Sequence, residues 1–599
     1  MANLPILRPF PVLYAMRMSG AAVVPSPADL EVEWQFDAVD LDAVERWLWS
    51  PPASLAVGVV PRGEQHLQDT YFDTADRIVG RAGYTLRLRR RADRPTEVTL
   101  KGTEATADAV DGGPRVRTEL SATADFGLAD LRAIDGRCGE VLRALLGTKS
   151  PAPLFEVHTT RRLFDLTLED GTTVEAALDR TAVHAAERAS SLSRVEVELT
   201  GGSRDSAGAF VAALRGAVPL RPAVWSKFGT GAMLAGLAPT EAVVDALVPG
   251  PRRFDRRATA HEVARAILRG ELAALLTHEP AARLGDDSEG VHQMRVATRR
   301  MRAGLRLFRD ALPPTWSAVR DEIRWLAGAL GAVRDLDVQV EALEPWVRDA
   351  ATTDPATTDP ATNDAAEHAA RLEVVRCLEA RRREARAALL AALDSPRFEA
   401  LTHTLTDLLR PRPRRPALRL RIKVRIPTDT EGGVARVASE LGALLGTAEG
   451  PRASVRIGSF GRRELGRAHR RYRKAARSLR PGSPPETYHR VRIVAKRLRY
   501  ASEFLAPLYG RDGRRFVRAV KAVQDALGEH QDAYVAAAQL RALATEEPSL
   551  SAQAVFSMGE LAASRRSEAA ALRRDVPRHL ERMARRWPPL RRRADQIAR

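Results

Sequence analysis

The sequence has 599 residues, of which 44% are hydrophobic and 28% are charged. A chain of this length exceeds what one hydrophobic core can serve, so we expect several domains. The net charge of +18 is unevenly spread: residues 1–250 carry 27 Lys+Arg against 33 Asp+Glu, and the rest of the chain carries +24. Such a basic region points to a polyanionic partner, namely nucleic acid, an anionic membrane surface or polyphosphate.

Cysteine content and hydropathy narrow the class of protein further. Cys138 and Cys377 are too few and too far apart for a disulfide framework or a zinc site, which suits a reducing cytosol. No apolar run reaches the roughly 18 residues that a membrane span needs. We therefore expect a cytoplasmic protein without a membrane partner, with a disordered leader at residues 1–28.

Residues 29–240 are typical of a strand-rich domain. Short runs of alternating polarity are separated by Gly, Pro and Asp, and alternation places residues i and i+2 on one face. The charged residues that share a face in this way are Glu31 with Glu33, Arg87 with Arg89, Glu97 with Lys101, Arg115 with Arg117 and Glu119, and Glu196 with Glu198. Any single pair fits the wet face of an ordinary sheet, whereas the whole set favours a closed barrel with a polar lumen.

These residue types indicate a chemistry for the lumen. Carboxylate pairs supply hard oxygen ligands for Mg²⁺ or Mn²⁺, and Arg and Lys pairs supply donors to phosphate oxygens. Together they predict a tunnel that holds a metal-bound chain of phosphates. In such a tunnel, charge neutralisation and positioning do most of the catalytic work.

The same region resembles the CYTH domain, also called the triphosphate tunnel metalloenzymes. Glu31-Val-Glu33-Trp-Gln35 is similar to the ExExK signature of that family. Further matching motifs are Tyr71-Phe72-Asp73-Thr74, Leu86-Arg87-Leu88-Arg89, Thr99-Leu100-Lys101-Gly102, Arg117-Thr-Glu119, Leu178-Asp179, Glu196-Val-Glu198 and Ser226-Lys227. The resemblance implies an eight-stranded antiparallel tunnel that binds triphosphate-type substrates and hydrolyses or cyclises them with a divalent metal.

The resemblance also implies roles for individual residues. The metal ligands would be Glu31, Glu33, Glu196 and Glu198, and the catalytic set would be Glu31, Glu33, Glu119 and Asp179. The substrate-binding cations would be Arg87, Arg89, Lys101, Arg117 and Lys227. Gln35 stands where the signature has a lysine, which removes a charge from the tunnel floor. A tunnel that binds substrate without turning it over is therefore the alternative.

Beyond Pro249-Gly250-Pro251 the sequence changes to long Ala/Leu/Arg/Glu segments with a period near 3.6, which predict helices. The predicted helices cover 258–276, 288–311, 318–345, 364–394, 460–480 and 486–508. A first helical half is expected at 251–410, with a low-complexity insertion at 351–364. A basic linker at 411–455 joins it to a second half at 456–599.

The two halves contain the same basic helix twice. His292, Arg295, Arg299, Arg300 and Arg302 recur 197 positions later as His489, Arg492, Lys496, Arg497 and Arg499. The same offset carries Leu330-Gly331 onto Leu527-Gly528 and Asp335 onto Asp532. Spacings of three, four and three residues place positions 292, 295, 299 and 302, with their counterparts in the second copy, along one stripe of each helix. An apolar stripe beside it predicts burial of Val291, Met294, Met301, Leu305 and Phe308, and of Val491, Leu498 and Leu505 in the second copy.

Clustered like charges repel on a helix, and an anionic ligand reverses the sign of that effect. A solvated basic face is the alternative for one such helix, but the preserved duplication favours a polyanion site. We expect His292 and His489 to hydrogen-bond phosphate or to pack between helices, since a metal site would need more ligands than Asp335 and Asp532 offer. These two aspartates are expected to pair with arginines of their own copy.

This region resembles the CHAD domain. The matching residues are VHQMRVATRRMR at 291–302 with LGAVRDLDV at 330–338, and YHRVRIVAKRLRYASE at 488–503 with LGEHQD at 527–532. The resemblance covers about 255–540 and implies two four-helix bundles with pseudo-two-fold symmetry and a basic surface that binds inorganic polyphosphate.

We therefore predict an α+β multidomain protein that binds polyphosphate and hydrolyses a tripolyphosphate or triphosphate group with Mg²⁺ or Mn²⁺. The alternative is a non-catalytic binding protein of polyphosphate granules. Nucleic acid is a disfavoured partner because aromatic residues make up only 5% of the chain and the basic helices lack interleaved rings.

Overall fold

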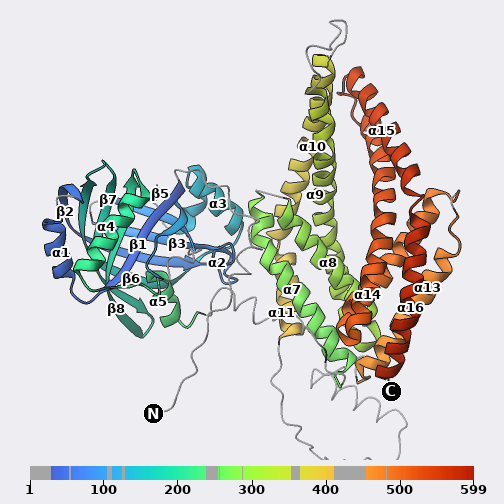
Figure 1. The fold of residues 1–599 in the computed structure, drawn as a ribbon, viewed down its shortest axis with the longest axis horizontal. Coiled ribbons are helices and arrows are strands. Elements are labelled where there is room, and N and C mark those ends of the chain that lie inside the picture. The colour runs from blue at the N-terminus through green and yellow to red at the C-terminus, as the bar shows by residue number, and fades with distance from the viewer. Residues whose placement is uncertain are drawn as a thin grey trace, which may run out of the picture. The chain divides into compact units, whose positions relative to one another are not determined.

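The computed structural model describes residues 29–598 apart from 53–54, 93, 104–110, 125–127, 238–253, 255–256, 286–287, 352–363, 411–453 and 481. The predicted leader at 1–28, nearly all of the insertion at 351–364 and nearly all of the linker at 411–455 lie outside the described residues. The chain divides into two compact units (Figure 1). One comprises residues 1–246 and 276–291, and the other comprises 247–275 and 292–599.

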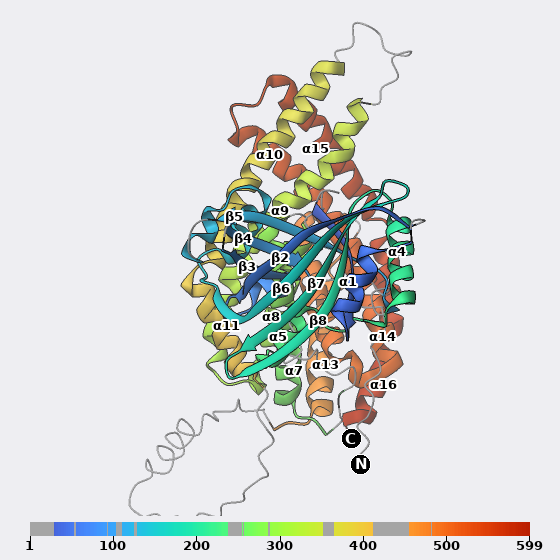
Figure 2. The same ribbon diagram turned by 90° about the vertical axis from the view of Figure 1, so that its left-hand side faces the viewer.

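In the described part of the first unit, nine strands form one antiparallel sheet. They are β1 Leu30–Ala38, β2 Ala56–Asp73, β3 Tyr84–Arg91, β4 Arg94–Gly102, β5 Arg115–Ala124, β6 Ala152–Leu168, β7 Thr173–Ala185, β8 Arg188–Gly201 and β9 Leu220–Pro222. The order is β5-β4-β3-β2-β6-β7-β8-β1-β9, and β1 also pairs with β5. Eight strands therefore close into the predicted barrel, and Figure 2 shows β2, β6, β7 and β8 side by side in its wall.

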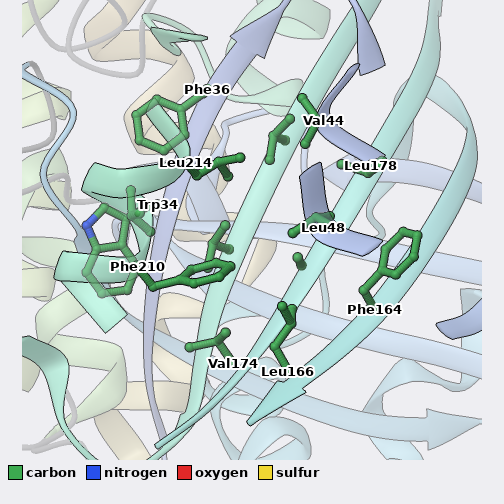
Figure 3. Close-up of a cluster of buried hydrophobic side chains, with 14 of the residues drawn as sticks. Trp34, Phe36, Val44, Leu48, Phe164, Leu166, Val174, Leu178, Phe210 and Leu214 are labelled. Atoms are coloured by element: carbon green, nitrogen blue, oxygen red, sulfur yellow. The ribbon is translucent and has the colours of Figure 1, made fainter. Parts of the chain in front are cut away.

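Helices cover parts of the outer face of this barrel. They are α1 Leu41–Trp49, α2 Ile78–Arg81, α3 Gly136–Leu146 and α4 Arg204–Ala217, with a 3₁₀ turn at Leu128–Ala133. A fifth helix, α5 Lys227–Leu234, packs instead on strand residues that face the lumen. Under α1 and α4, the strands bury Trp34, Phe36, Leu166 and Leu178 against Phe210 (Figure 3). Because side chains alternate along a strand, sending these apolar residues outward sends their charged neighbours into the lumen.

The second unit is mostly helical, as predicted. Its helices are α7 Ala260–Leu284, α8 Glu289–Leu307, α9 Trp316–Ala351, α10 Asp364–Leu393, α11 Pro396–Leu409, α13 Ile457–Ala476, α14 Pro485–Glu546, α15 Ala552–Leu572 and α16 Val576–Ala598, with a 3₁₀ turn at Arg309–Ala311. The long α14 is two helices joined at Gly510, whose φ of 59° and ψ of −127° break the helical path. With that break counted, the described residues of each half pass through five helical segments, one more than the four that were predicted.

Backbone hydrogen bonds show how the two halves are related. The Ala260 amide donates to the Val455 carbonyl at 2.8 Å, and the Ile457 amide donates to the Ala258 carbonyl at 2.9 Å. Residues 258 and 455, like 260 and 457, occupy equivalent places in the 197-residue repeat. When two equivalent segments each donate the same hydrogen bond to the other, a two-fold axis relates them. These reciprocal bonds therefore agree with the predicted pseudo-two-fold symmetry.

The apolar stripes lie where the periodicity placed them. Val291, Met294, Met301, Leu305 and Phe308 are buried, as are Val491, Leu498 and Leu505. Phe308 stacks on Phe460 of the other half with ring centroids 5.1 Å apart. Of the helices in the described ranges, none has the length and apolar character that a membrane crossing requires.

Candidate functional site

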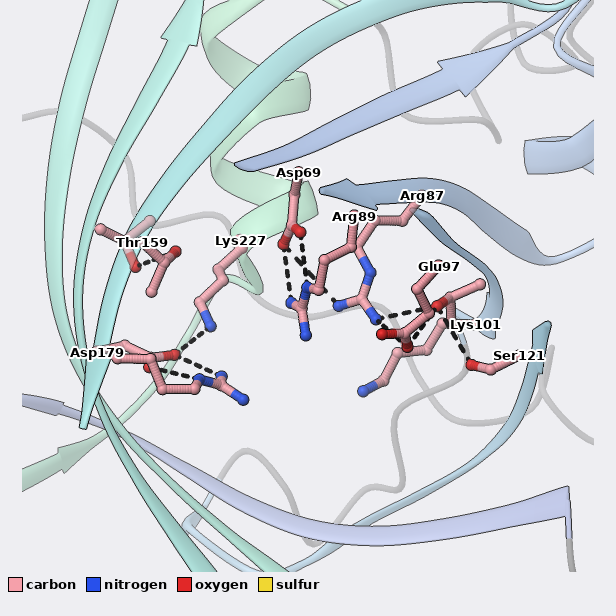
Figure 4. A network of polar contacts seen from close by, with 12 residues as sticks. Asp69, Arg87, Arg89, Glu97, Lys101, Ser121, Thr159, Asp179 and Lys227 are labelled. Atoms are coloured by element: carbon pink, nitrogen blue, oxygen red, sulfur yellow. Dashed lines mark hydrogen bonds and ion pairs between the residues drawn. The ribbon is translucent and has the colours of Figure 1, made fainter. Parts of the chain in front are cut away.

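The lumen of the barrel is lined by charged side chains that pair with one another (Figure 4). At one side, Lys101 Nζ lies 2.6 Å from Glu31 and 3.0 Å from Glu119. Arg117 contacts Glu31 at 3.2 Å and also pairs with Glu33. The five predicted site residues of this group thus lie close together, although they come from three different strands.

Next to this group lies a second ionic cluster. Arg89 donates twice to Asp69, at 2.7 and 2.9 Å, while Arg87 lies 3.8 Å from both Glu97 and Glu119. Burial alone would raise the pKa of Asp69, but Arg89 and Arg87 outweigh it and lower that pKa to about 2. Asp69 is therefore ionised, and it holds the two arginines in place in the lumen.

The third cluster joins the barrel wall to α5. Lys227, the first residue of α5, pairs with Asp179 and lies 3.0 Å from Glu196. Arg161 donates to Asp179 at 2.8 Å and also to Glu196. Burial opposes ionisation of Glu196, but Lys227 and Arg161 still hold its pKa well below the ordinary value.

The local fold explains how Lys227 reaches the lumen. Ser226 caps α5 by accepting a hydrogen bond from the Gly229 amide at 3.0 Å, as an N-cap serine does. Phe228 then packs on Tyr71 and Phe155 of the barrel, with ring centroids 5.5 and 5.6 Å away. This aromatic anchor fixes the start of the helix against the strands.

Glu198 is a lumen carboxylate that pairs with no cation among the described residues. Its backbone lies opposite Glu33 on β1 and Glu175 on β7. Burial and the neighbouring charge of Glu31 raise the pKa of Glu198 to about 7 although Lys101 opposes them. No ion pair or hydrogen bond from another described residue reaches its side chain.

This donor set fits a hard divalent cation, which would relieve the repulsion between the carboxylates. Within the described residues, however, no three metal-ligating side chains are already assembled around one point. Lys101 and Arg117 hold Glu31 and Glu33 instead. Glu31, Glu33 and Glu198 could hold a metal only after those two cations turn to another anion, such as phosphate.

Gln35 occupies the position of the signature lysine. Its amide donates to Glu33 at 2.9 Å and to Glu196 at 3.4 Å, so it bridges two predicted metal ligands. Its carbonyl oxygen is buried and has no partner in the described structure. The amide therefore bridges the two carboxylates but contributes no positive charge.

Two lumen residues, Asp69 and Arg161, were not selected from the sequence. The alternation that could have found them is ambiguous on β6, where Arg161 and Arg162 are adjacent. The pairing of β6 with β7 decides the matter: Arg161 lies opposite Asp179 and points inward, whereas Arg162 reaches Asp42 on the outside.

In the helical unit, the two copies of the basic stripe form equivalent ion pairs. Arg295 donates to Asp335 at 2.8 Å, and Arg492 donates to Asp532 at 3.0 Å. The prediction that each aspartate pairs with an arginine of its own copy is confirmed. Both aspartates are largely exposed, so these pairs neutralise the arginines only in part.

One arginine of the repeated motif lies between the two halves. Arg300 donates to Glu271 at 2.7 Å and to Glu503 at 2.9 Å, and it stacks on Phe504 at 5.1 Å. It therefore links the two halves and is already neutralised. Arg499 is similar, because it pairs with Glu503 at 3.1 Å.

Several cations of the two copies meet in a pocket of about 330 Å³. Arg299 of the first copy lines it together with Arg492 and Lys496 of the second, and the lining also includes Asp525 and Glu529. Burial and the charges of Arg492 and Arg299 lower the pKa of Lys496 to about 8. The buried Nε atoms of Arg299 and Arg492 have no partner among the described residues. Such a concentration of incompletely neutralised cations suits an anionic ligand.

A further cation cluster adjoins the stripe. Burial, together with Arg320 and Arg324 of α9, lowers the pKa of Arg302, and Arg306 next to it also responds to Arg497. Sequence reasoning selected Arg302 and Arg497 but missed the other three, because they lie outside the duplicated pattern. The structure shows that positive charge extends beyond the motif.

The two histidines differ between the copies. His489 is exposed, and its Nδ1 lies 3.1 Å from the side-chain oxygen of Gln531. His292 is half-buried. Their predicted contact with phosphate stays a prediction.

Comparison with known proteins agrees with both units. Residues 51–217 match the CYTH domain model, and residues 266–541 match the CHAD domain model. The chain therefore joins a CYTH domain to a CHAD domain, a combination that supports a function related to triphosphates or polyphosphate. Tunnel enzymes with the CYTH domain are generally metal-dependent, which agrees with the donor chemistry of the lumen.

Individual relatives cover most of the chain. The uncharacterized proteins MT2285 and Rv2226, from two strains of Mycobacterium tuberculosis, are each 26% identical over 549 residues, which is 85% of this chain and 88% of theirs. The crystal structure of the CHAD domain from the plant Ricinus communis is 29% identical and covers 55% of this chain and 94% of its own, with a TM-score of 0.41. PptA from Streptomyces chartreusis is 19% identical, with coverages of 54% and 100% and a TM-score of 0.38.

Proposed function

We propose that the helical unit binds inorganic polyphosphate, and that the barrel binds a triphosphate-type group and hydrolyses it with Mg²⁺ or Mn²⁺. The observation that carries the catalytic part is the lumen, where Lys101 and Arg117 are held on the carboxylates that would otherwise bind a metal. The cations that would bind phosphate and the carboxylates that would bind metal thus lie together, and each set neutralises the charge of the other until substrate binds.

Substrate binding would separate the two sets. A phosphate chain in the lumen offers Lys101, Arg117 and Arg87 stronger, charge-assisted partners than the carboxylates they now share. Glu31, Glu33 and Glu198 are then free to hold the divalent metal, which supplies charge neutralisation at the phosphate oxygens. Because phosphate must draw the cations away before the carboxylates can hold the metal, metal binding and substrate binding would depend on each other.

Hydrolysis requires an in-line water and a group that accepts its proton. Burial opposes ionisation of Glu119, but Lys101 and Arg87 hold the pKa of this carboxyl at about 2. Once phosphate draws these cations away, Glu119 becomes a stronger base and can orient the water. The water oxygen would form a bond to the terminal phosphorus while Glu119 accepts the water's proton. The bond from that phosphorus to the bridging oxygen would break, which releases orthophosphate and the chain shortened by one phosphate.

Phosphate release from tripolyphosphate, with and without each metal, tests this proposal. We expect metal-dependent phosphate release, and we expect its rate to fall by at least about 100-fold in Glu33→Gln. This variant lacks one of the proposed metal ligands, so the charge of the transition state is less well stabilised. Glu64→Gln is the matched control, because Glu64 lies on the same barrel but on its exposed outer face.

The alternative is that the barrel binds substrate without hydrolysing it, and Gln35 is the observation that favours it. If the parent protein releases no phosphate with either metal but still binds tripolyphosphate, this alternative stands. Gln35→Lys then shows whether one missing charge is the cause: restored release would identify the substitution as the reason for inactivity.

Binding by the helical unit is tested by competition. Long-chain polyphosphate is expected to displace DNA from the full chain at equal phosphate concentration, with steep salt dependence for both ligands. Preference for DNA would contradict the proposed ligand. Residence in the cytoplasm and on polyphosphate granules is part of the same proposal and can be followed with a fluorescent fusion.

A further inference from the structure

The second helical half carries a basic surface that the first half lacks. Together, α13 and α16 contain 14 Arg and Lys against three Asp and Glu. The first and last helices of the other half, α7 and α11, contain four against five. The excess therefore belongs to one copy and lies outside the duplicated stripe.

Packing between α13 and α16 uses their apolar sides. His469 of α13 stacks on Trp587 of α16 with centroids 3.7 Å apart, and Tyr472 and Met583 are buried nearby in the two helices. The two helices lie side by side at one edge of the helical unit in Figure 1. Their cations are left on the sides that do not pack.

These cations converge from both helices. Burial lowers the pKa of His469 to about 4, with further contributions from Arg473, Arg470 and Arg591, so all three guanidinium groups lie around the same ring. The cations of the two helices that are exposed, and that make no ion pair with another described residue, are Arg470, Arg471, Arg473, Lys474, Arg578, Arg582, Arg585, Arg586, Arg591 and Arg592. We call this set the α13–α16 face.

The scaffold itself does not need this charge. In the first half, the positions equivalent to Arg470, Arg471, Arg473 and Lys474 are occupied by Ala273, Ala274, Leu276 and Thr277. Like charges at these spacings repel, which costs a few tenths of a kcal/mol per pair on a solvated helix. A bound polyanion would remove this repulsion. It would also be attracted to the positive charge of the face, as an anion is to any positively charged surface.

We propose that the α13–α16 face is a second contact surface for the phosphate chain that occupies the pocket of Arg299 and Lys496. It rests on the proposed function of the helical unit and adds selectivity for chain length. A short chain fills the pocket, whereas a long chain also reaches the face across α14, which packs against both α13 and α16. Binding at two linked surfaces multiplies the affinity without any new contact in the pocket.

Side-chain chemistry favours polyphosphate over nucleic acid at this face. The aromatic rings of α13 and α16 are engaged in the core: Phe460 and Tyr472 are buried, and Trp587 stacks on His469. Among the described residues of these helices, no exposed Phe, Tyr or Trp is left on which bases could stack. The face thus offers contacts to phosphate oxygens alone, and nine of its ten cations are arginines.

The test compares two four-fold neutral variants of the full chain. One carries Arg470→Gln, Arg473→Gln, Lys474→Gln and Arg591→Gln. The matched control carries Arg376→Gln, Arg383→Gln, Arg541→Gln and Arg566→Gln, four exposed arginines on α10, α14 and α15 of the same unit. Binding of long-chain polyphosphate and of tripolyphosphate is measured without divalent metal, so that hydrolysis does not interfere, and circular dichroism verifies folding.

We expect the α13–α16 variant to lose roughly tenfold in affinity for the long chain, because the second of two linked contacts is weakened. Its affinity for tripolyphosphate should stay within about twofold of the parent, and its salt dependence for the long chain should flatten. The control variant should lose little for either probe.

Three outcomes would overturn the proposal. Equal losses in the two variants would show only an effect of net charge, and equal losses for both probes would place the face within the short-chain site. If the α13–α16 variant still bound long-chain polyphosphate but no longer bound DNA, the face would be a nucleic-acid site. If the parent bound neither probe, the proposed function of the helical unit would fail as well, which separates the two failures.

Discussion

The barrel lumen and the pocket of the helical unit both gather cations, but they neutralise them in different ways. In the lumen, Arg89, Arg161 and Lys227 contact buried carboxylates at hydrogen-bonding distances. In the helical pocket, Arg299 and Lys496 have no such partner among the described residues. A closed, poorly hydrated site must balance its charge internally, because an unpaired buried ion costs several kcal/mol. An open surface can leave that task to water and to its ligand.

This difference has a functional consequence. A ligand that enters the lumen must compete with internal carboxylates, so we expect binding there to be selective and to depend on a metal that binds the displaced carboxylates. A ligand at the helical surface displaces mainly water and counterions. We expect the first site to discriminate among small phosphates and the second to favour long, highly charged chains.

The largest expected effect comes from removing a buried acid of the lumen. Asp179→Asn leaves Arg161 and Lys227 without their shared carboxylate, which should cost about 3–5 kcal/mol of unfolding free energy. Urea unfolding followed by far-UV circular dichroism, in which the β-rich and helical units differ, measures the change. Asp165→Asn is the control, because the pair of Asp165 with Arg62 is exposed to solvent and should shift the transition little. A similar shift in both variants would contradict the contrast drawn here.

Within the helical unit, two neighbouring arginines should behave differently. Arg299→Gln is expected to weaken polyphosphate binding roughly tenfold without loss of stability, since it removes a charge-assisted contact in the pocket. Arg300→Gln should instead cost about 1–3 kcal/mol of stability, because Glu271 and Glu503 lose their common partner. Titration of polyphosphate and thermal unfolding, applied to both variants, separate the two roles. If both variants lost binding equally, Arg300 would belong to the site.

The low pKa of Lys496 predicts a dependence on pH. Because burial and neighbouring arginines lower this pKa to about 8, the side chain is protonated below pH 8 and increasingly neutral above it. Polyphosphate affinity should therefore be highest at neutral pH and fall by about threefold between pH 7 and 9. Lys496→Arg, which copies Arg299 of the first half, stays charged and should abolish the decline. A decline that persists in this variant would point to another group.

The smallest effect is expected from the acidic wall of the pocket. Asp525 and Glu529 stand where the first copy has Gly328 and Ala332, so only the second copy opposes an incoming phosphate. Asp525→Asn should tighten polyphosphate binding by about twofold, because a solvated like charge is removed. Glu379→Gln, an exposed change of the same charge on α10, should have no effect in the same titration. Weaker binding by Asp525→Asn would indicate that this carboxylate assists the ligand.

Local periodicity predicted much of the architecture. Strand alternation placed Glu31, Glu33, Lys101 and Arg117 on one face, and closure of β1 on β5 brings them together in the lumen. Helical spacing predicted the apolar stripes, and the duplication predicted that Asp335 and Asp532 would each pair with an arginine of their own copy. These inferences held because they depend on spacings of two, three and four residues, which the sequence states directly.

The roles that could not be predicted depend on how distant segments meet. Helical spacing separates Arg299, which lies on the stripe, from its neighbour Arg300. Only packing against Glu271 and Glu503, however, makes Arg300 a link between the halves and leaves Arg299 in the pocket. Likewise, only the pairing of β6 with β7 turns Arg161 inward and Arg162 outward. By itself the sequence determined which residues share a face. Only the tertiary structure decided what each face meets, because strand register and helix rotation are set by contacts between residues far apart in the chain.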